Sequence, residues 1–435
     1  MAQSISKEEA DALRQQVAIL KAQVEALESR LDKQETAQEA TAAALAAAPK
    51  TVAPAPAADN IKVSWKGAPE ISTSNGWSFK PRGRMQFDAG DVRGPQGFVN
   101  ASQGFSSELR RLYIGAQGTI PGGFSYLIDL DFAPANTEIT DAFLAYKDKA
   151  LTVTVGQFKP FWSIDELTSD LNISLMERAA FTQAFGFERR VGISAAYAKG
   201  DVSVSAGAFT DNIADLQNDH DNSYSIDGRV VWAPEFDGNQ LHLAASAHWR
   251  KLNDLSGTDM RYRARPGVHS TDLRYISTPF FRAEHETGYG LEAGWFNGGV
   301  HVLGEAYWQN ADVVGASNAH FFGGYAEAGV FLTRGDNRNY GKGSFGSVKP
   351  KSGLDAGGIG AIELVVRYDR LDLNGGSVNG GTEDSGYVGV SWWPVEHLRF
   401  MLNYGHLEFR NVLVTANGDR DFGADTFAAR AQIDF

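Results

Sequence analysis

The sequence contains no cysteine, which excludes disulfide bonds and thiolate metal sites. A chain without thiols also suits export through an oxidising periplasm. The catalytic patterns HExxH and GxSxG are absent, and Gly341-Lys342 lacks the glycine spacing and the following Ser or Thr of a phosphate-binding loop. The nine histidines are scattered along the chain. We therefore expect neither an enzyme nor a bound cofactor.

Long apolar runs and an excess of positive charge are missing too. No stretch of about 18 apolar residues occurs, so no transmembrane helix is expected. The net charge of −13 argues against a nucleic-acid partner. The first residues, Met1 to Ser4, lack the basic region and the apolar stretch of a signal peptide. We expect a mature chain from which such a peptide has been removed.

What the sequence does contain, from Trp77 to Phe435, is a repeated alternation of apolar and polar residues. In the last such run, Phe427 and Ile433 fall on one face of an extended strand, while Arg430 and Gln432 fall on the other. The runs are too many and too aromatic on the dry face for a soluble sandwich to be the simplest interpretation. A transmembrane β-barrel has apolar side chains toward lipid and polar ones toward a watery lumen. The alternation therefore indicates a pore.

The number of runs supports a closed barrel, because an even number of antiparallel strands is typical. Long and short connections alternate, as outer loops and periplasmic turns do. One connection on the short-turn side, residues 334–355, is unexpectedly long. We predict an all-β fold, a 16-stranded antiparallel transmembrane barrel over residues 77–435 that crosses the outer membrane of a Gram-negative cell. The strands are expected near 78–89, 107–119, 122–132, 138–149, 151–158, 188–199, 201–210, 223–233, 240–250, 285–297, 299–309, 319–333, 356–371, 384–393, 396–409 and 422–435.

The amino-terminal region has a different pattern. Residues 1–45 are predicted to form a periplasmic coiled-coil helix with a start at Ser6, because apolar residues follow alternating spacings of four and three. Valine at the a positions and leucine at the d positions favours dimers. The alternative is a single amphipathic helix lying on the barrel. Residues 46–76 are read as a Pro/Ala-rich linker and lead-in. The seam residues are Leu13, Val17, Leu20, Val24, Leu27 and Leu31.

Arginines are concentrated on the polar faces. Arg82 and Arg84 alternate with apolar residues on one strand, and Arg111 shares a face with Tyr113. In the loop 251–284, arginines occupy positions 261, 263 and 265, so three guanidinium groups point the same way in an extended chain. Such a row grips anions through paired donors and lets them pass from site to site. The alternative is that the arginines only pair with lumen carboxylates.

The acidic segment Asp211–Asn222 is a candidate metal site of a weaker kind. Its aspartates, at positions 211, 215, 219 and 221, lack the spacing of a calcium-binding loop. We expect a solvated acidic loop here and no metal ion.

Several segments, in this order along the chain, resemble the phosphate-selective porins O and P of Gram-negative outer membranes. The resemblance implies a homotrimer of 16-stranded barrels, with the third loop, the fifth loop and the long inner turn narrowing each lumen. It extends the proposed anion pathway to Arg82, Arg84, Arg110, Arg111, Lys159, Arg261, Arg263 and Arg265. The matching segments are Phe79–Gln86, Leu109–Tyr113, Val155–Phe161, Glu177-Arg178, the three loop arginines and Val348–Pro350.

One segment departs from that family. Its phosphate-selective members carry lysines at the constriction after the fifth strand, whereas this chain has Ile164–Asp170 there. Asp165, Glu166 and Asp170 are therefore predicted to oppose anions at the constriction. Lys159 stands at the entrance to this segment.

These observations predict an outer-membrane porin for passive diffusion of small hydrophilic solutes, with a weak preference for phosphate-like anions. Its expected partners are identical subunits, outer-membrane lipids with lipopolysaccharide, and the solutes themselves. Two alternatives remain open: a solute-specific or general porin without anion selectivity, and a structural tether that links the outer membrane to the cell wall through residues 6–45.

Overall fold

The computed structural model describes Lys21 and residues 61–435, except for residues 97–102, 217–221, 254–259, 342 and 414–417. Apart from Lys21, the predicted coiled coil and the Pro/Ala-rich part of the linker lie outside these residues. Everything reported below belongs to one compact unit, Asn60–Phe435. Among the described helices, none is long and apolar enough to span a membrane.

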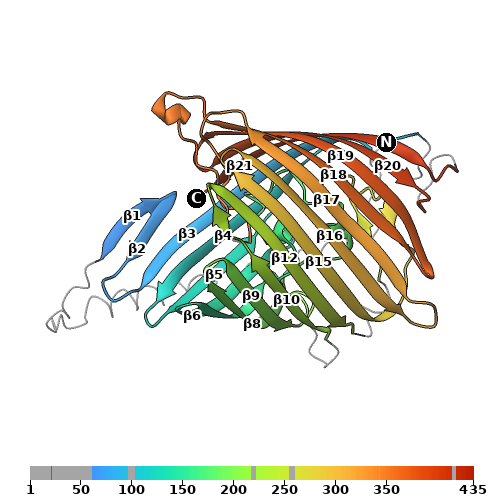
Figure 1. Ribbon diagram of the computed structural model, residues 1–435, viewed down its shortest axis with the longest axis horizontal. Helices are drawn as coiled ribbons and strands as arrows, with labels where there is room; N and C mark the ends of the chain where they lie inside the picture. Colours follow the sequence, from blue (N-terminus) through green and yellow to red (C-terminus); the bar gives the residue numbers. More distant parts are fainter. Residues whose placement is uncertain are drawn as a thin grey trace. The chain divides into compact units, whose positions relative to one another are not determined.

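Sixteen strands of the described residues form one antiparallel barrel, whose neighbouring strands follow each other in chain order (Figure 1). The barrel closes where the last strand pairs with the first, with Ala429 opposite Ala89 and Asp434 opposite Arg84. At this seam Gly83 and Phe435 exchange two backbone hydrogen bonds of 3.2 and 3.0 Å. The strands are β3 (Ser78–Arg93), β4 (Gly104–Ile120), β5 (Phe124–Asp131), β6 (Glu138–Asp148), β7 (Leu151–Phe158), β8 (Arg190–Lys199), β9 (Val202–Phe209), β10 (Tyr224–Trp232), β12 (Asn239–Lys251), β15 (Ala283–Asn297), β16 (Val300–Val313), β17 (Ala319–Phe331), β18 (Ala361–Gly375), β19 (Val378–Val395), β20 (Leu398–Arg410) and β21 (Phe422–Asp434).

The alternation of the sequence is confirmed as the inside and outside of the barrel. On β18, Glu363 and Arg367 are 0% and 5% exposed, whereas Val366 is 47% exposed. On β21, Arg430 and Gln432 are buried and Phe427 and Ile433 are exposed. Polar side chains therefore fill the interior and apolar ones cover the outer wall, as in a barrel surrounded by lipid.

The predicted strands are confirmed, with shifts at their ends. The strand predicted at 356–371 begins at Ala361, because η1 (Leu354–Ala356) and a left-handed Gly360 precede it. The lead-in contains a hairpin that the sequence did not predict. Its strands β1 (Lys62–Lys66) and β2 (Ala68–Ser72) pair with each other, and Ile71 of β2 lies opposite Phe79 of β3.

Three connections fold into the lumen. The third loop, residues 159–189, carries α2 (Ile164–Leu167) and α3 (Ala180–Ala184). The fifth loop, residues 252–282, carries β13 (Arg263–Ala264) and β14 (Ile276–Ser277), and the inner turn, residues 332–360, joins β17 to β18. The smaller β11 (Glu235–Phe236) lies in the turn between β10 and β12.

These insertions have an apolar core of their own inside the polar barrel. Phe181 of the third loop lies 5.9 Å from the Tyr307 ring and 6.5 Å from the Tyr325 ring, both on the barrel wall. Tyr340 of the inner turn stacks on Phe296 at 4.7 Å. The core occupies one side of the lumen, and the polar passage is left on the other.

The candidate channel and its constriction

The third loop is fixed to many points of the inner wall. At its start, the indole of Trp162 donates to Asp227, and Ser246 donates to the Trp162 carbonyl at 2.7 Å. Further along, the backbone of Asp165 donates to Glu305 at 2.9 Å. These bonds hold the loop against β10, β12 and β16.

The middle of the loop is held by arginines from the last strands. Arg399 donates to the carbonyls of Leu171 and Ile173 at 3.2 and 2.9 Å, and Arg430 donates to the Met176 carbonyl at 2.8 Å. The loop therefore crosses the lumen as a rigid partition. An open cavity of about 740 Å³ remains between it and the wall formed by β4, β5 and β6.

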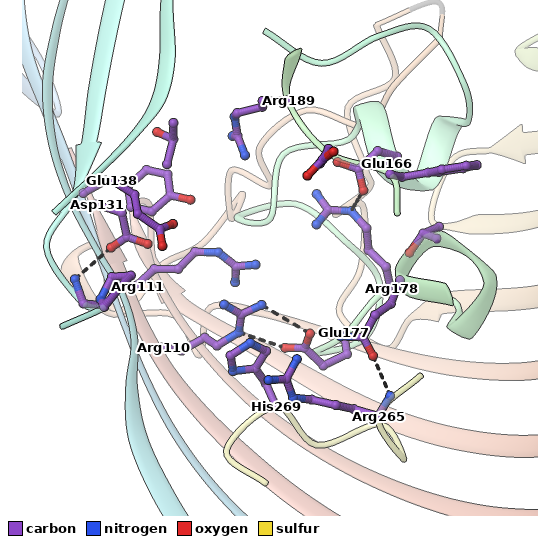
Figure 2. Close-up of a pocket in the computed structure, with 18 of the residues that line it drawn as sticks. Arg110, Arg111, Asp131, Glu138, Glu166, Glu177, Arg178, Arg189, Arg265 and His269 are labelled. Carbon is purple, nitrogen blue, oxygen red and sulfur yellow. Dashed lines mark hydrogen bonds and ion pairs between the residues drawn. The ribbon is translucent and has the colours of Figure 1, made fainter. Parts of the chain in front are cut away.

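Two adjacent arginines of β4 both reach this cavity (Figure 2). Neighbouring side chains of a regular strand face opposite sides. Here Gln86 of β3 pairs with Arg111, and the next residue, Phe87, pairs with Leu109, so Arg110 is an extra residue in the ladder. This β-bulge turns both guanidinium groups inward. Arg110 lies 3.4 Å from Glu177, and Arg111 lies 2.7 Å from Asp170.

A network of charged side chains joins the third loop to the inner wall beside this cavity, and we name it the constriction cluster. Of its members, the cavity itself is lined by Arg111, Glu166, Arg178 and Arg189. Its shortest contacts include Lys159 to Glu166 at 3.0 Å and Arg178 to Glu166 at 3.3 Å. Arg189 lies 2.8 Å from Asp141. Six cations face four carboxylates, which leaves an excess of two positive charges. The cluster comprises Arg82, Arg84, Arg111, Lys159, Arg178, Arg189, Asp129, Asp141, Glu166 and Asp170.

The carboxylates at 165–170 do not stand alone in the passage. Asp170 contacts both Arg84 and Arg111. Burial alone would raise the pKa of Asp170, but these two guanidinium groups outweigh it and hold the pKa well below its usual range. The pKa of Glu166 is lowered for the same reason, against burial, by Arg178 and Lys159. Asp165 accepts a 2.8 Å bond from the Ala179 backbone. All three acids therefore act as anchors of the loop.

Lys159 is the titratable cation of the cluster. Its side chain is 14% exposed, and besides the ion pair it donates to the Glu166 carbonyl at 2.5 Å. Burial, together with the nearby Arg178 and against the attraction of Glu166, lowers the pKa of Lys159 to about 8.

The three alternate arginines of the fifth loop share one face, as the spacing predicted. Tyr262 and Ala264 between them are buried, while Arg261, Arg263 and Arg265 are partly exposed. They line a second cavity of about 760 Å³ at the outer mouth. The guanidinium of Arg261 lies over the Phe280 ring at 4.5 Å. Their role in conduction stays a prediction.

Arg274 lines the same cavity, and the sequence did not single it out. Partial burial and the like charges of Arg265 and Arg263 lower the pKa of Arg274 to about 10. Arg189 and Arg178 were likewise absent from the predicted pathway. Neither stands in a repeated spacing. Arg178 was noted only as part of the Glu177-Arg178 segment, and only the folding of the third loop places both arginines beside the cavity.

The remaining predicted arginines lie deeper. Arg82 lies 3.2 Å from Asp129 and donates to Gln117 at 2.9 Å. Beyond it, toward the end of the barrel where β3 begins and β21 ends, a cavity of about 390 Å³ is lined by Lys66, Glu70 and Lys80. The hairpin β1–β2 thus contributes to the inner mouth.

The acidic segment after β9 is less exposed at its start than the sequence predicted. Asp211 was predicted to lie in a solvated loop, but it is buried and lies 2.6 Å from Arg250. A guanidinium partner and the Ser223 backbone, which donates to it at 2.8 Å, account for its burial. Within the described part of the chain, no group of histidine or carboxylate side chains is arranged to hold a metal ion.

Comparison with known proteins agrees with this architecture. Residues 79–435 match the family described as phosphate-selective porin O and P. The chain belongs to this porin family. An uncharacterized protein of Caulobacter vibrioides is 42% identical over 99% of this chain and 91% of its own length.

The porin also shares its fold with solved outer-membrane structures. A loop-deletion mutant of OmpT from Vibrio cholerae has a TM-score of 0.53 at 10% identity, covering 83% of this chain and all of that one. An anion-selective porin from Comamonas acidovorans has a TM-score of 0.51 at 10% identity, covering 82% and 100%. The protein is therefore an outer-membrane channel of the porin class and not an enzyme.

Proposed function

We propose that this porin passes small hydrophilic solutes with a weak preference for anions and holds no saturable phosphate site. The observation that supports the preference is the excess of positive charge in the constriction cluster. A low-dielectric wall strengthens the effect of such an excess on passing ions.

Cations continue on both sides of the cluster. The outer cavity is bordered by Arg261, Arg263 and Arg274, and the inner one by Lys80. Arg265 borders both the outer cavity and the cavity beside the third loop. An anion would move from one weak site to the next, which permits conduction without trapping.

The pairing of the cluster argues for a weak preference. Arg84 and Arg111 already share Asp170, and Arg178 shares Glu166 with Lys159. A phosphate ion would have to compete with these buried carboxylates for the same donors. A general porin without anion selectivity is the second candidate, because the cavity of about 740 Å³ is also lined by carboxylates outside the cluster, which offset the positive excess. They are Glu108, Asp131, Glu138, Glu177, Glu188 and Asp215.

Reversal potentials in a potassium chloride gradient across a planar bilayer test the preference. The wild type should favour chloride, and the triple variant Arg261→Ala, Arg263→Ala, Arg265→Ala should favour it less at low salt. A triple variant with unchanged selectivity would contradict a role for the arginine row. Phosphate that blocks the chloride current at micromolar levels would show a saturable site.

We further propose a homotrimer, with residues 1–45 as a periplasmic coiled coil. The resemblance of the whole barrel to its family supports the assembly, and OmpT of Vibrio cholerae, with which this chain shares its fold, has been solved in a trimer form. Mass measurement in a mild detergent tests it; a monomeric mass would exclude the trimer. The alternative, a tether to the cell wall, is tested with residues 1–60 fused to a soluble carrier. If the tether exists, purified peptidoglycan should retain this fusion.

A further inference from the structure

The hairpin of β5 and β6 carries two pairs of carboxylates. Asp129 lies directly opposite Asp141, and Asp131 lies directly opposite Glu138. Like charges in directly opposed positions of an antiparallel sheet repel each other and destabilise it. Each pair therefore needs positive charge close by.

The protein itself supplies that charge to the first pair. Arg82 lies 3.2 Å from Asp129, and Arg189 lies 2.8 Å from Asp141. Both arginines belong to the constriction cluster. The first pair is thus part of the network that joins the third loop to the wall.

The second pair has no such partner. Asp131 is 6% exposed, and its carboxylate accepts backbone hydrogen bonds from Leu112 at 3.1 Å and Ala133 at 3.0 Å. Within the described part of the chain, neither Asp131 nor Glu138 forms an ion pair. Carboxylates held out of water without a counter-charge are costly. Both line the cavity of about 740 Å³, so a solute in that cavity can supply the missing charge.

Guanidinium groups line the same cavity. Arg111 and Arg189 project into it beside the carboxylate pair (Figure 2). Arg111 donates to Gln86 at 2.7 Å through Nη1, and Arg189 donates to Asp141 through Nη2. Each guanidinium carries five donors, and the Nε of Arg189 has no hydrogen-bond partner. A solute with a single charge is therefore repelled by one of these two groups of side chains, whatever its sign.

We propose that this cavity favours dipolar solutes, which carry an ammonium group at one end and a carboxylate at the other, such as amino acids and short peptides. The ammonium group lies against Asp131 and Glu138. The carboxylate accepts hydrogen bonds from Arg111 and Arg189. The cavity has the size of pockets that hold small organic molecules, and an extended dipeptide spans only about 7 Å. The inference rests on the proposed passage of small hydrophilic solutes and adds the class of solute.

Uptake of radiolabelled dipeptides into proteoliposomes that contain the full-length porin tests the proposal. Glycylglycine, with both charges, is compared with its amide, which keeps only the ammonium group, and with its N-acetylated amide, which has no charge. The α-amino group has a pKa of about 7.7–8.0, so potassium chloride at pH 6.5 keeps it charged. The wild type should take up glycylglycine about threefold faster than the uncharged derivative, the effect expected of an exposed ion pair.

Glu138→Gln should remove most of this advantage and leave uptake of the uncharged derivative unchanged, which also shows that the variant is folded and open. Glu70→Gln is the matched control. It removes the same charge from the inner mouth, where Glu70 lies 2.6 Å from Lys66, and it should keep the wild-type advantage. Equal losses in both variants would overturn the proposal, because they would reflect overall charge alone.

The amide separates a dipolar site from a simple cation site. The proposal is overturned if the amide enters the wild type as fast as glycylglycine does, since the carboxylate would then contribute nothing. A wild type that conducts and prefers chloride, but takes up all three derivatives at one rate, would overturn this inference alone. A chain without stepwise conductance would overturn the proposed function as well.

Discussion

Raising the pH should weaken the anion preference of the channel, because Lys159 loses its charge. The pKa of Lys159 is lowered to about 8 by burial and by Arg178. A lowered lysine pKa means that the charged form is present below this value and lost above it. The side chain is about nine-tenths charged at pH 7 and about one-tenth charged at pH 9. The arginines of the constriction cluster keep their charge over this range.

The size of the effect follows from Coulomb's law. One elementary charge about 6 Å from a passing ion, in water, contributes about 0.7 kcal/mol. Its loss makes passage about threefold harder for an anion and about threefold easier for a cation. The chloride to potassium permeability ratio should therefore fall by up to about tenfold between pH 7 and pH 9, and by less at high salt, where screening is stronger.

Reversal potentials of single channels, measured at both pH values in dilute potassium chloride, provide the assay. Lys159→Met should have the low ratio at both pH values. Lys80→Met removes a cation from the inner mouth but leaves Lys159 in place, so it should lower the ratio and keep the pH dependence. The reasoning is refuted if the wild-type ratio is the same at pH 7 and pH 9, or if Lys159→Met retains the wild-type slope.

Three further outcomes are expected. Deleting residues 1–60 should leave a folded, conducting barrel, because the sixteen strands close on themselves. Loss of heat-resistant trimers on gels after this deletion would show that the deleted segment holds the subunits together. Asp170→Asn leaves Arg84 and Arg111 without their shared partner and should destabilise the barrel by about 3 kcal/mol or more, whereas Asp272→Asn, at a side chain 97% exposed, should leave the thermal unfolding temperature unchanged. Phe345→Ala removes a buried ring from the inner turn and should lower the free energy of unfolding by about 3 kcal/mol. Single-channel records of this variant should show extra noise and larger steps, and records as quiet as those of the wild type would contradict a turn held by this ring.

The number of strands and the face on which each side chain lies could be predicted from the sequence. Both depend on the alternation with a period of two that every strand repeats. The inward Arg430 and the outward Phe427 needed only their places in the alternation. Arg110 could not be placed in this way, since by alternation it faces lipid and only an extra residue in the β4 ladder turns it inward. The hairpin β1–β2 was missed because its strands are short and follow a Pro/Ala-rich segment.

The charge balance of the constriction was beyond the sequence for a different reason. Asp170 and Arg84 are 86 positions apart, and their contact depends on how the third loop crosses the lumen. A count of charges in the segment 164–170 suggests an acidic barrier. Only the fold reveals that Asp170 meets Arg84 and Arg111 of distant strands. Glu166 is paired with Lys159 and Arg178 of its own loop.

The two backbone hydrogen bonds between Gly83 and Phe435 have a consequence for how the barrel forms. A barrel seam that joins residues so far apart along the chain closes late, because the entropic cost of closing so long a loop is incurred in one step. Until Phe435 arrives, the edge of β3 exposes unpaired backbone groups that attract foreign strands. Assembly therefore depends on keeping that edge covered. A chain that lacks its last residues should aggregate through the open edge of β3 before it could insert as a defective pore.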